Sequence, residues 1–207
     1  MPLNKIKLEN FINKLSGYSI INEVDNQYKN DIPTKNLAKY FENMHLLEPS
    51  ILLVGEAPGY QGCAITGIPF TSEFIISTHN TSGALNGCLA IGTKKEPTAT
   101  MVWGILDELL KSEKLPTKPL MWNIFPFHPI KDGNINTNRK PNKEECVYGF
   151  NVLNELLDLF PTIEKIYAIG TVANKILNTH PKYVGMLRHP SNGGKRKFKE
   201  GMYNIFL

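Results

Sequence analysis

The chain has 207 residues, 42% of them hydrophobic, which suits one compact domain over residues 1–207, with the N-terminal helices of residues 1–45 packed on it. Its formal net charge of +4 permits a polyanionic partner without requiring one. Its three cysteines are far apart and no apolar run approaches the roughly 20 residues of a membrane span. A disulfide framework, a cysteine-ligated metal site and a membrane protein are therefore not expected, and we predict a cytoplasmic protein without metal or cofactor.

Two helices are predicted first, followed by a buried strand. Apolar residues recur at helical spacing in two stretches, namely Leu8, Phe11, Ile12 and Leu15, and then Leu37, Tyr40, Phe41 and Met44. At residues 50–54 the pattern changes to the short apolar run "SILLV", which ends at Gly55. Such a run is typical of a strand that is buried on both faces of a parallel sheet.

Three more runs of this kind follow, and helices separate them. The strands are predicted at 120–124, 165–170 and 183–187, with helices at 100–111 and 143–159 and a shorter one from near Thr171. Asn142, with Glu145 three residues later, resembles the capping pair that starts a helix. Residues 78–98 are predicted to form a long polar loop. Strands that alternate with helices form right-handed βαβ units, so we expect an α/β protein with a three-layer α/β/α domain around a central four-stranded parallel sheet.

A polar motif follows each of the four strands, except that the second motif lies after or within its strand. They are "GEAPG" at 55–59, Asn123 with "FPFHP" at 125–129, "GTVAN" at 170–174 and "RHPSNGG" at 188–194. The carboxyl ends of parallel strands meet at one edge of the sheet, where ligands bind. Each motif alone has an ordinary structural explanation, such as a strand-to-helix turn for "GEAPG" or a structural role for His189. Because all four motifs are expected at the same edge of the sheet, together they indicate one binding site.

The set of motifs, in this order, resembles the uracil-DNA glycosylase superfamily from about residue 45 to the C-terminus. The matching stretches are "VGEAPG" at 54–59, "TGIPF" at 66–70, "WNIFPFHP" at 122–129 and "HPS" at 189–191. "GEAPG" and "GIPF" are most similar to the iron–sulfur branch of that superfamily, which needs four cysteine ligands. Because the chain has three cysteines, the resemblance implies the fold and the base pocket but no cluster.

The resemblance implies a hydrolase of N-glycosyl bonds that takes uracil or a related damaged base out of DNA, as in base excision repair. It places Phe70 against the flipped base, and Asn123 where its amide donates to O4 and accepts from N3–H of uracil. It places His189 where it donates toward O2 as the base leaves as an anion. Glu56 is expected to position or deprotonate the attacking water, since the next position, often an acid or asparagine elsewhere in the superfamily, is Ala57.

The remaining site residues are expected to accommodate the DNA backbone. Gly55 and Gly59 carry no side chain, which would let sugar, phosphate and water approach the main chain. The residues expected to contact DNA are Pro58, Gly59, Pro190, Ser191, Asn192, Lys195 and Arg196. Lys195 and Arg196 belong to the basic run "KRKFK", for which a solvated helix face is an equally good explanation.

Two positions bear on the choice of substrate. Gly59 stands where the uracil-only branch has a tyrosine that excludes the methyl group of thymine. Asn192 and Gly193 stand where members with "HPSPLS" have a proline and the leucine that fills the gap left by the flipped base. We therefore expect a pocket open to C5-substituted bases, and a preference for uracil-containing or damaged DNA that is single-stranded or mismatched.

Two other functions fit the same residues. One is a catalytically silent nucleic-acid-binding member of the superfamily, which the missing iron ligands and Ala57 favour. The other is a hydrolase of free nucleosides. We expect the chain to act as a monomer.

Overall fold

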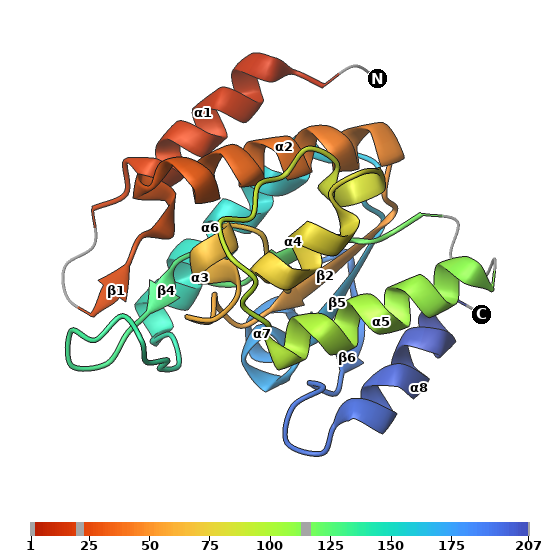
Figure 1. The fold of residues 1–207 in the computed structure, drawn as a ribbon. Coiled ribbons are helices and arrows are strands. Elements are labelled where there is room, and N and C mark those ends of the chain that lie inside the picture. Colours follow the sequence, from red (N-terminus) through yellow and green to blue (C-terminus); the bar gives the residue numbers. More distant parts are fainter. Residues whose placement is uncertain (1–2, 20–22, 113–116, 207) are drawn as a thin grey trace.

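The protein is built around one parallel sheet with helices on both faces (Figure 1). Its computed structural model describes residues 3–19, 23–112 and 117–206. The sheet contains β2 (Ile51–Gly55), β3 (Leu120–Asn123), β5 (Lys165–Ile169) and β6 (Tyr183–Leu187), in the order β3-β2-β5-β6, with every neighbouring pair parallel. This confirms the predicted four-stranded α/β fold.

The helices fall into groups that cover different parts of the sheet. Figure 1 shows α4 (Glu73–His79), α5 (Pro97–Lys111) and α8 (Lys195–Ile205) in front of the sheet, and α6 (Lys143–Leu159) and α7 (Thr171–Leu177) behind it. This division follows from right-handed crossovers, because the chain passes from β2 to β3 in one direction and then returns past β2 to reach β5 and β6. No helix in the described ranges is long and apolar enough to cross a membrane.

The N-terminal helices α1 (Lys5–Ser16) and α2 (Asp31–Leu47) pack into the same core and cover the edge of the sheet at β3. The ring of Phe41 lies 6.0 Å from that of Phe11 and 5.7 Å from that of Trp122 in β3. The backbone N–H of Met121 donates to the hydroxyl of Tyr40 at 2.9 Å. An otherwise unpaired donor of the edge strand is therefore satisfied by α2.

The start of α6 was predicted correctly, whereas the prediction of a loop at 78–98 was correct only in part. Asn142 and Glu145 form a reciprocal capping box at the start of α6. Residues 78–98 instead include the end of α4, the 3-10 helix η2 (Gly83–Leu85) and the first residues of α5. Helix α5 begins at Pro97, three residues earlier than expected, because Glu96 caps it and proline is favoured in a first turn.

Several short elements were missed by the sequence analysis. They are α3 (Cys63–Thr66), α4, α8, the 3-10 helix η1 (Gln27–Lys29), and the antiparallel pair β1 (Val24–Asp25) and β4 (His128–Pro129). Most are too short to show a periodic pattern. Helix α8 is long enough, but only Phe198 and Met202 are buried in it, within a strongly polar stretch.

Candidate active site

A cavity of about 340 Å³ lies at the carboxyl ends of β2 and β3. Its walls come from separate parts of the chain, namely residues 56–59, 62–63 and 70–71, Glu96 and Thr98, Asn123, Asn138 and Arg139, and finally His189 and Ser191. Of the residues expected at the site, this cavity brings together Glu56, Ala57, Pro58, Gly59, Phe70, Asn123, His189 and Ser191. Five others do not line it, namely Gly55, Pro190, Asn192, Lys195 and Arg196.

Gly55 has a different role from the one expected. It pairs with Asn123 across β2 and β3, and a Cβ atom on it would lie 2.4 Å from Cζ of Phe70 and 2.8 Å from Oδ1 of Asn123. The space above Gly55 is thus filled by side chains of the protein itself, not left for sugar, phosphate or water. Gly55 allows the aromatic ring and the amide to sit together on the end of β2.

Phe70 is held in a conformation that few residues adopt. Its φ angle is +53°, in the left-handed region that is uncommon for a residue with a side chain. The indole N–H of Trp103 donates to the carbonyl oxygen of Phe70 at 3.1 Å. Helix α5, which carries Trp103, therefore helps to fix the backbone of a partly exposed aromatic residue in the cavity wall, as is common at functional sites.

Asn123 is buried at the end of β3, with 4% of its surface exposed. Its amide nitrogen lies 3.9 Å from Sγ of Cys63, to which it can donate weakly. Burial raises the pKa of the Cys63 thiol, so the sulfur is uncharged at neutral pH. In this orientation Asn123 retains one N–H and its carbonyl oxygen for a ligand.

Glu56 follows β2 directly and is half-buried in the cavity wall. Burial raises the pKa of its carboxyl group, and the positive charge of Lys140 partly opposes this effect. No hydrogen-bond donor to the Glu56 carboxylate is found among the described residues. Its oxygens are therefore available to a bound molecule.

His189 is oriented by Ser191, two residues further along the chain. The backbone N–H of Ser191 donates to Nδ1 at 3.2 Å, and its hydroxyl oxygen lies 2.7 Å from the same nitrogen. Because Nδ1 accepts, the proton of the neutral ring is on Nε2. Burial lowers the pKa of His189, with Glu96 opposing this and Arg188 adding to it. The ring is therefore a neutral donor at neutral pH.

The remaining predicted DNA contacts lie outside the cavity. Pro190 is buried, while Asn192 and Gly193 are exposed and have φ angles of +51° and +74°. Lys195 and Arg196 are exposed at the start of α8.

The sequence did not reveal three of the charged or amide residues in the cavity wall, namely Glu96, Asn138 and Arg139. Both carboxylate oxygens of Glu96 accept from the first turn of α5, at Thr98 and Ala99. Asn138 and Arg139 enter from the segment that precedes α6. An acidic residue before a proline is a recognisable helix start and could have identified Glu96 as a cap. Nothing in the sequence indicated that this cap, or the 138–139 pair, lies beside His189 and Glu56.

The comparisons with known proteins decide the family. The model of the uracil DNA glycosylase superfamily matches residues 42–205, which is most of the chain. The chain belongs to the uracil DNA glycosylase superfamily. The crystal structure of wild-type SMUG2 from Pedobacter heparinus has the same fold, with a TM-score of 0.70 at 18% identity over 97% of this chain and 96% of that one. No match was found among curated proteins.

The cysteines of this chain do not provide the ligands of an iron–sulfur cluster. Its only cysteines are Cys63, Cys88 and Cys146, one fewer than the four thiolates that such a cluster needs. All three are free and buried, in different parts of the fold. Across the described ranges, no group of three or more histidine, cysteine or acidic side chains is placed to hold a metal ion.

Proposed function

We propose that the protein is a DNA glycosylase that hydrolyses the N-glycosidic bond of uracil or a related damaged base. One observation supports this proposal above all others. A single cavity is lined by four residues that are far apart in the sequence, namely Phe70, Asn123, His189 and Glu56. This set supplies an apolar ring, a base-reading amide, a neutral donor and a carboxylate. Within this proposal the chain acts as a monomer in the cytoplasm, in base excision repair.

Base recognition rests on the fixed wall of the cavity. The flipped base stacks on the ring of Phe70, while the amide of Asn123 donates to O4 and accepts from N3–H. As the glycosidic bond breaks, the electron pair stays with the base and charge develops on O2. The Nε2–H of His189 then stabilises that charge in a partly desolvated site, which can lower the barrier by several kcal/mol.

Glu56 acts on the other partner of the reaction, the water. An ionised carboxylate beside the sugar stabilises the positive charge that develops on it and accepts a proton from the attacking water. The free oxygens of Glu56 fit this role, and the charge of Lys140 favours the ionised form. Ala57, which carries no polar group, leaves this task to Glu56.

Two local features support the wider substrate range expected from the sequence. A Cβ on Gly59 would meet only Asn138, at 4.0 Å, so this part of the wall is open. Bases with a substituent at C5, such as thymine opposite guanine or 5-hydroxymethyluracil, then fit. The exposed turn at Asn192 and Gly193 offers no apolar side chain to replace a flipped base, which favours single-stranded or mismatched DNA.

An excision assay with two substrates tests this function. A labelled oligonucleotide that contains one uracil and free deoxyuridine are each incubated with the protein, and release of uracil is measured. Release from the oligonucleotide alone supports a DNA glycosylase. Release from deoxyuridine alone supports a nucleoside hydrolase, and tight DNA binding without release from either supports a silent binding protein.

A further inference from the structure

The segment of residues 130–142, which joins β4 to α6, forms a wall of the cavity that is separate from the His189 loop. It contributes Asn138 and Arg139 to the lining, whereas the C-terminal part contributes His189 and Ser191. Figure 1 shows the 130–142 segment at the left of the molecule and the loop that leads into α8 at the bottom. The 138–139 residues and the His189 loop are therefore separate parts of the cavity wall.

Arg139 makes this segment rigid. Its guanidinium group donates to both carboxylate oxygens of Glu145, at 2.7 and 2.8 Å, and to the backbone oxygen of Glu23 at 2.9 Å. Its backbone N–H donates to Pro129 at 3.1 Å. The charge of Arg139 is thus neutralised within the protein, and its role is to hold the residues on either side of it.

Asn138 is fixed with its amino group free. Its Oδ1 accepts from the backbone N–H of Tyr60 at 3.1 Å, which determines the orientation of the amide. The NH2 group donates to no described residue, and it lies beside Gly59 at the cavity wall. A preoriented donor of this kind suits an oxygen atom of a ligand at low entropic cost.

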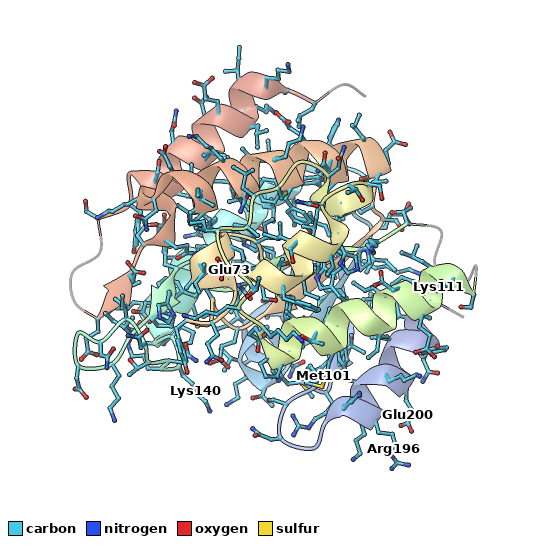
Figure 2. All side chains as sticks on the ribbon, in the orientation of Figure 1. Glu73, Met101, Lys111, Lys140, Arg196 and Glu200 are labelled. Atoms are coloured by element: carbon cyan, nitrogen blue, oxygen red, sulfur yellow. The ribbon has the colours of Figure 1, made fainter. Side chains whose placement is uncertain are left out.

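Lys140 supplies an unpaired positive charge next to this donor. Its side chain is exposed and forms no ion pair with any described residue. Figure 2 shows it projecting from the lower edge of the molecule, the edge at which Arg196 of α8 also projects. Its positive charge lowers the pKa of the Glu56 carboxyl group, against the larger effect of burial.

We propose that Asn138 and Lys140 form a phosphate subsite for the DNA strand next to the flipped nucleotide. This inference rests on the proposed function, since it concerns the same substrate. The strand then lies between the 138–140 segment and the basic start of α8, with a phosphodiester oxygen accepting from the Asn138 amide and facing the Lys140 ammonium group. Such contacts supply affinity and register without base choice.

The affinity for a substrate analogue that is not cleaved tests the contribution of this subsite to binding separately from catalysis. The probe is a single-stranded oligonucleotide with one 2′-fluoro-2′-deoxyuridine, whose fluorine opposes the positive charge that develops on the sugar. Affinity is measured by fluorescence anisotropy over a range of salt concentrations. We expect Lys140→Gln to weaken binding about five- to tenfold at low salt and to reduce the salt slope by about 0.7, the value for one phosphate contact on a single strand.

Two further variants complete the design. Asn138→Asp keeps the oxygen that accepts from Tyr60 but replaces the donor by a negative charge, so we expect it to bind the probe more weakly than Lys140→Gln does. Lys111→Gln is the matched control, because Lys111 is exposed at the far end of α5 (Figure 2), about 20 Å along the helix from Glu96. We expect its binding to equal that of the parent.

The outcomes separate the subsite from the function. If the parent binds the probe and releases uracil, while Lys140→Gln and Asn138→Asp bind it with the affinity and slope of Lys111→Gln, the subsite is overturned and the proposed function stands. If the parent binds no DNA, both are overturned. Because Lys140 and Asn138 are exposed, thermal melting of these variants is expected to match that of the parent.

Discussion

The two walls that carry the main predicted site residues are built in different ways. At the ends of β2 and β3, Gly55, Phe70 and Asn123 are in such close contact that one added carbon on Gly55 would overlap the other two. The turn after His189 is instead held by a few hydrogen bonds, and its tip at Asn192 and Gly193 is exposed. Packing therefore fixes the first wall, and solvent surrounds the tip of the second.

This difference matches what each wall has to do in the proposed reaction. Reading a base edge and stabilising developing charge require groups that do not reorganise when the bond breaks. A DNA strand varies in sequence and conformation, so a turn that meets it can adapt. Substitutions in the first wall should therefore change the rate of chemistry, and substitutions at the tip should change the choice of strand.

The largest effect is expected when a contact to the transition state is removed. Asn123→Ala and His189→Ala should each lower the single-turnover rate of uracil release by about two orders of magnitude or more, because each contact contributes a few kcal/mol. Rapid-quench measurement of excision from a uracil-containing oligonucleotide tests this. If both variants release uracil nearly as fast as the parent, this cavity is not the active site.

Glu56→Gln should lower the same rate about tenfold or more. The amide keeps the shape of the side chain but cannot take a proton from water or stabilise positive charge on the sugar. DNA binding, measured by anisotropy, should stay nearly intact. If binding is lost instead, Glu56 has a structural role.

Gly55→Ala tests whether the first wall depends on packing. The added methyl group must displace Phe70 or Asn123, which we expect to cost about 1–3 kcal/mol in the free energy of unfolding and to lower activity several-fold. Gly59→Ala is the matched control, since its Cβ has room. Equal melting temperatures and equal activities of the two variants would show that the wall can rearrange.

Activity should fall as the pH is lowered. Burial raises the pKa of Glu56 above its ordinary value and lowers that of His189 below its ordinary value, and protonation of either group removes the form that the mechanism uses. Glu96→Gln keeps a cap on α5 but removes a charge that raises the pKa of His189. In a Glu56→Gln background, where His189 controls the remaining profile, we expect Glu96→Gln to move the acidic limb to lower pH. A limb that stays in place or moves to higher pH contradicts this.

The smallest effect is expected at the exposed tip. Gly193→Leu supplies an apolar side chain that can fill the space left by a flipped base, although the positive φ angle at this position disfavours it. We expect a few-fold gain on duplex DNA and little change on single strands. Equal parental rates on both substrates, unchanged by the substitution, would mean that another part of the protein fills the gap.

The sequence was sufficient to predict those site residues whose positions follow from the strand topology. Asn123 ends a strand, and Glu56 and His189 come shortly after one; because parallel strands end at one edge, the meeting of these residues was predictable. Glu96 and Asn138 reach the cavity through connections whose paths depend on long-range contacts, such as the Arg139–Glu145 pair, which no local pattern reveals. The role of Gly55 was misjudged because a glycine in a sequence does not say which neighbour needs the space.

The close contact at the end of β2 also limits how this wall can change over evolutionary time. Because Gly55, Phe70 and Asn123 share one volume, the effect of substituting one depends on the residues present at the other two. A larger residue at position 55 requires both Phe70 and Asn123 to give way, and in the proposed function these two residues stack on the base and read its edge. Within the proposed function, base preference is therefore expected to change more readily by substitution on the open side of the cavity, near Gly59, than in this wall.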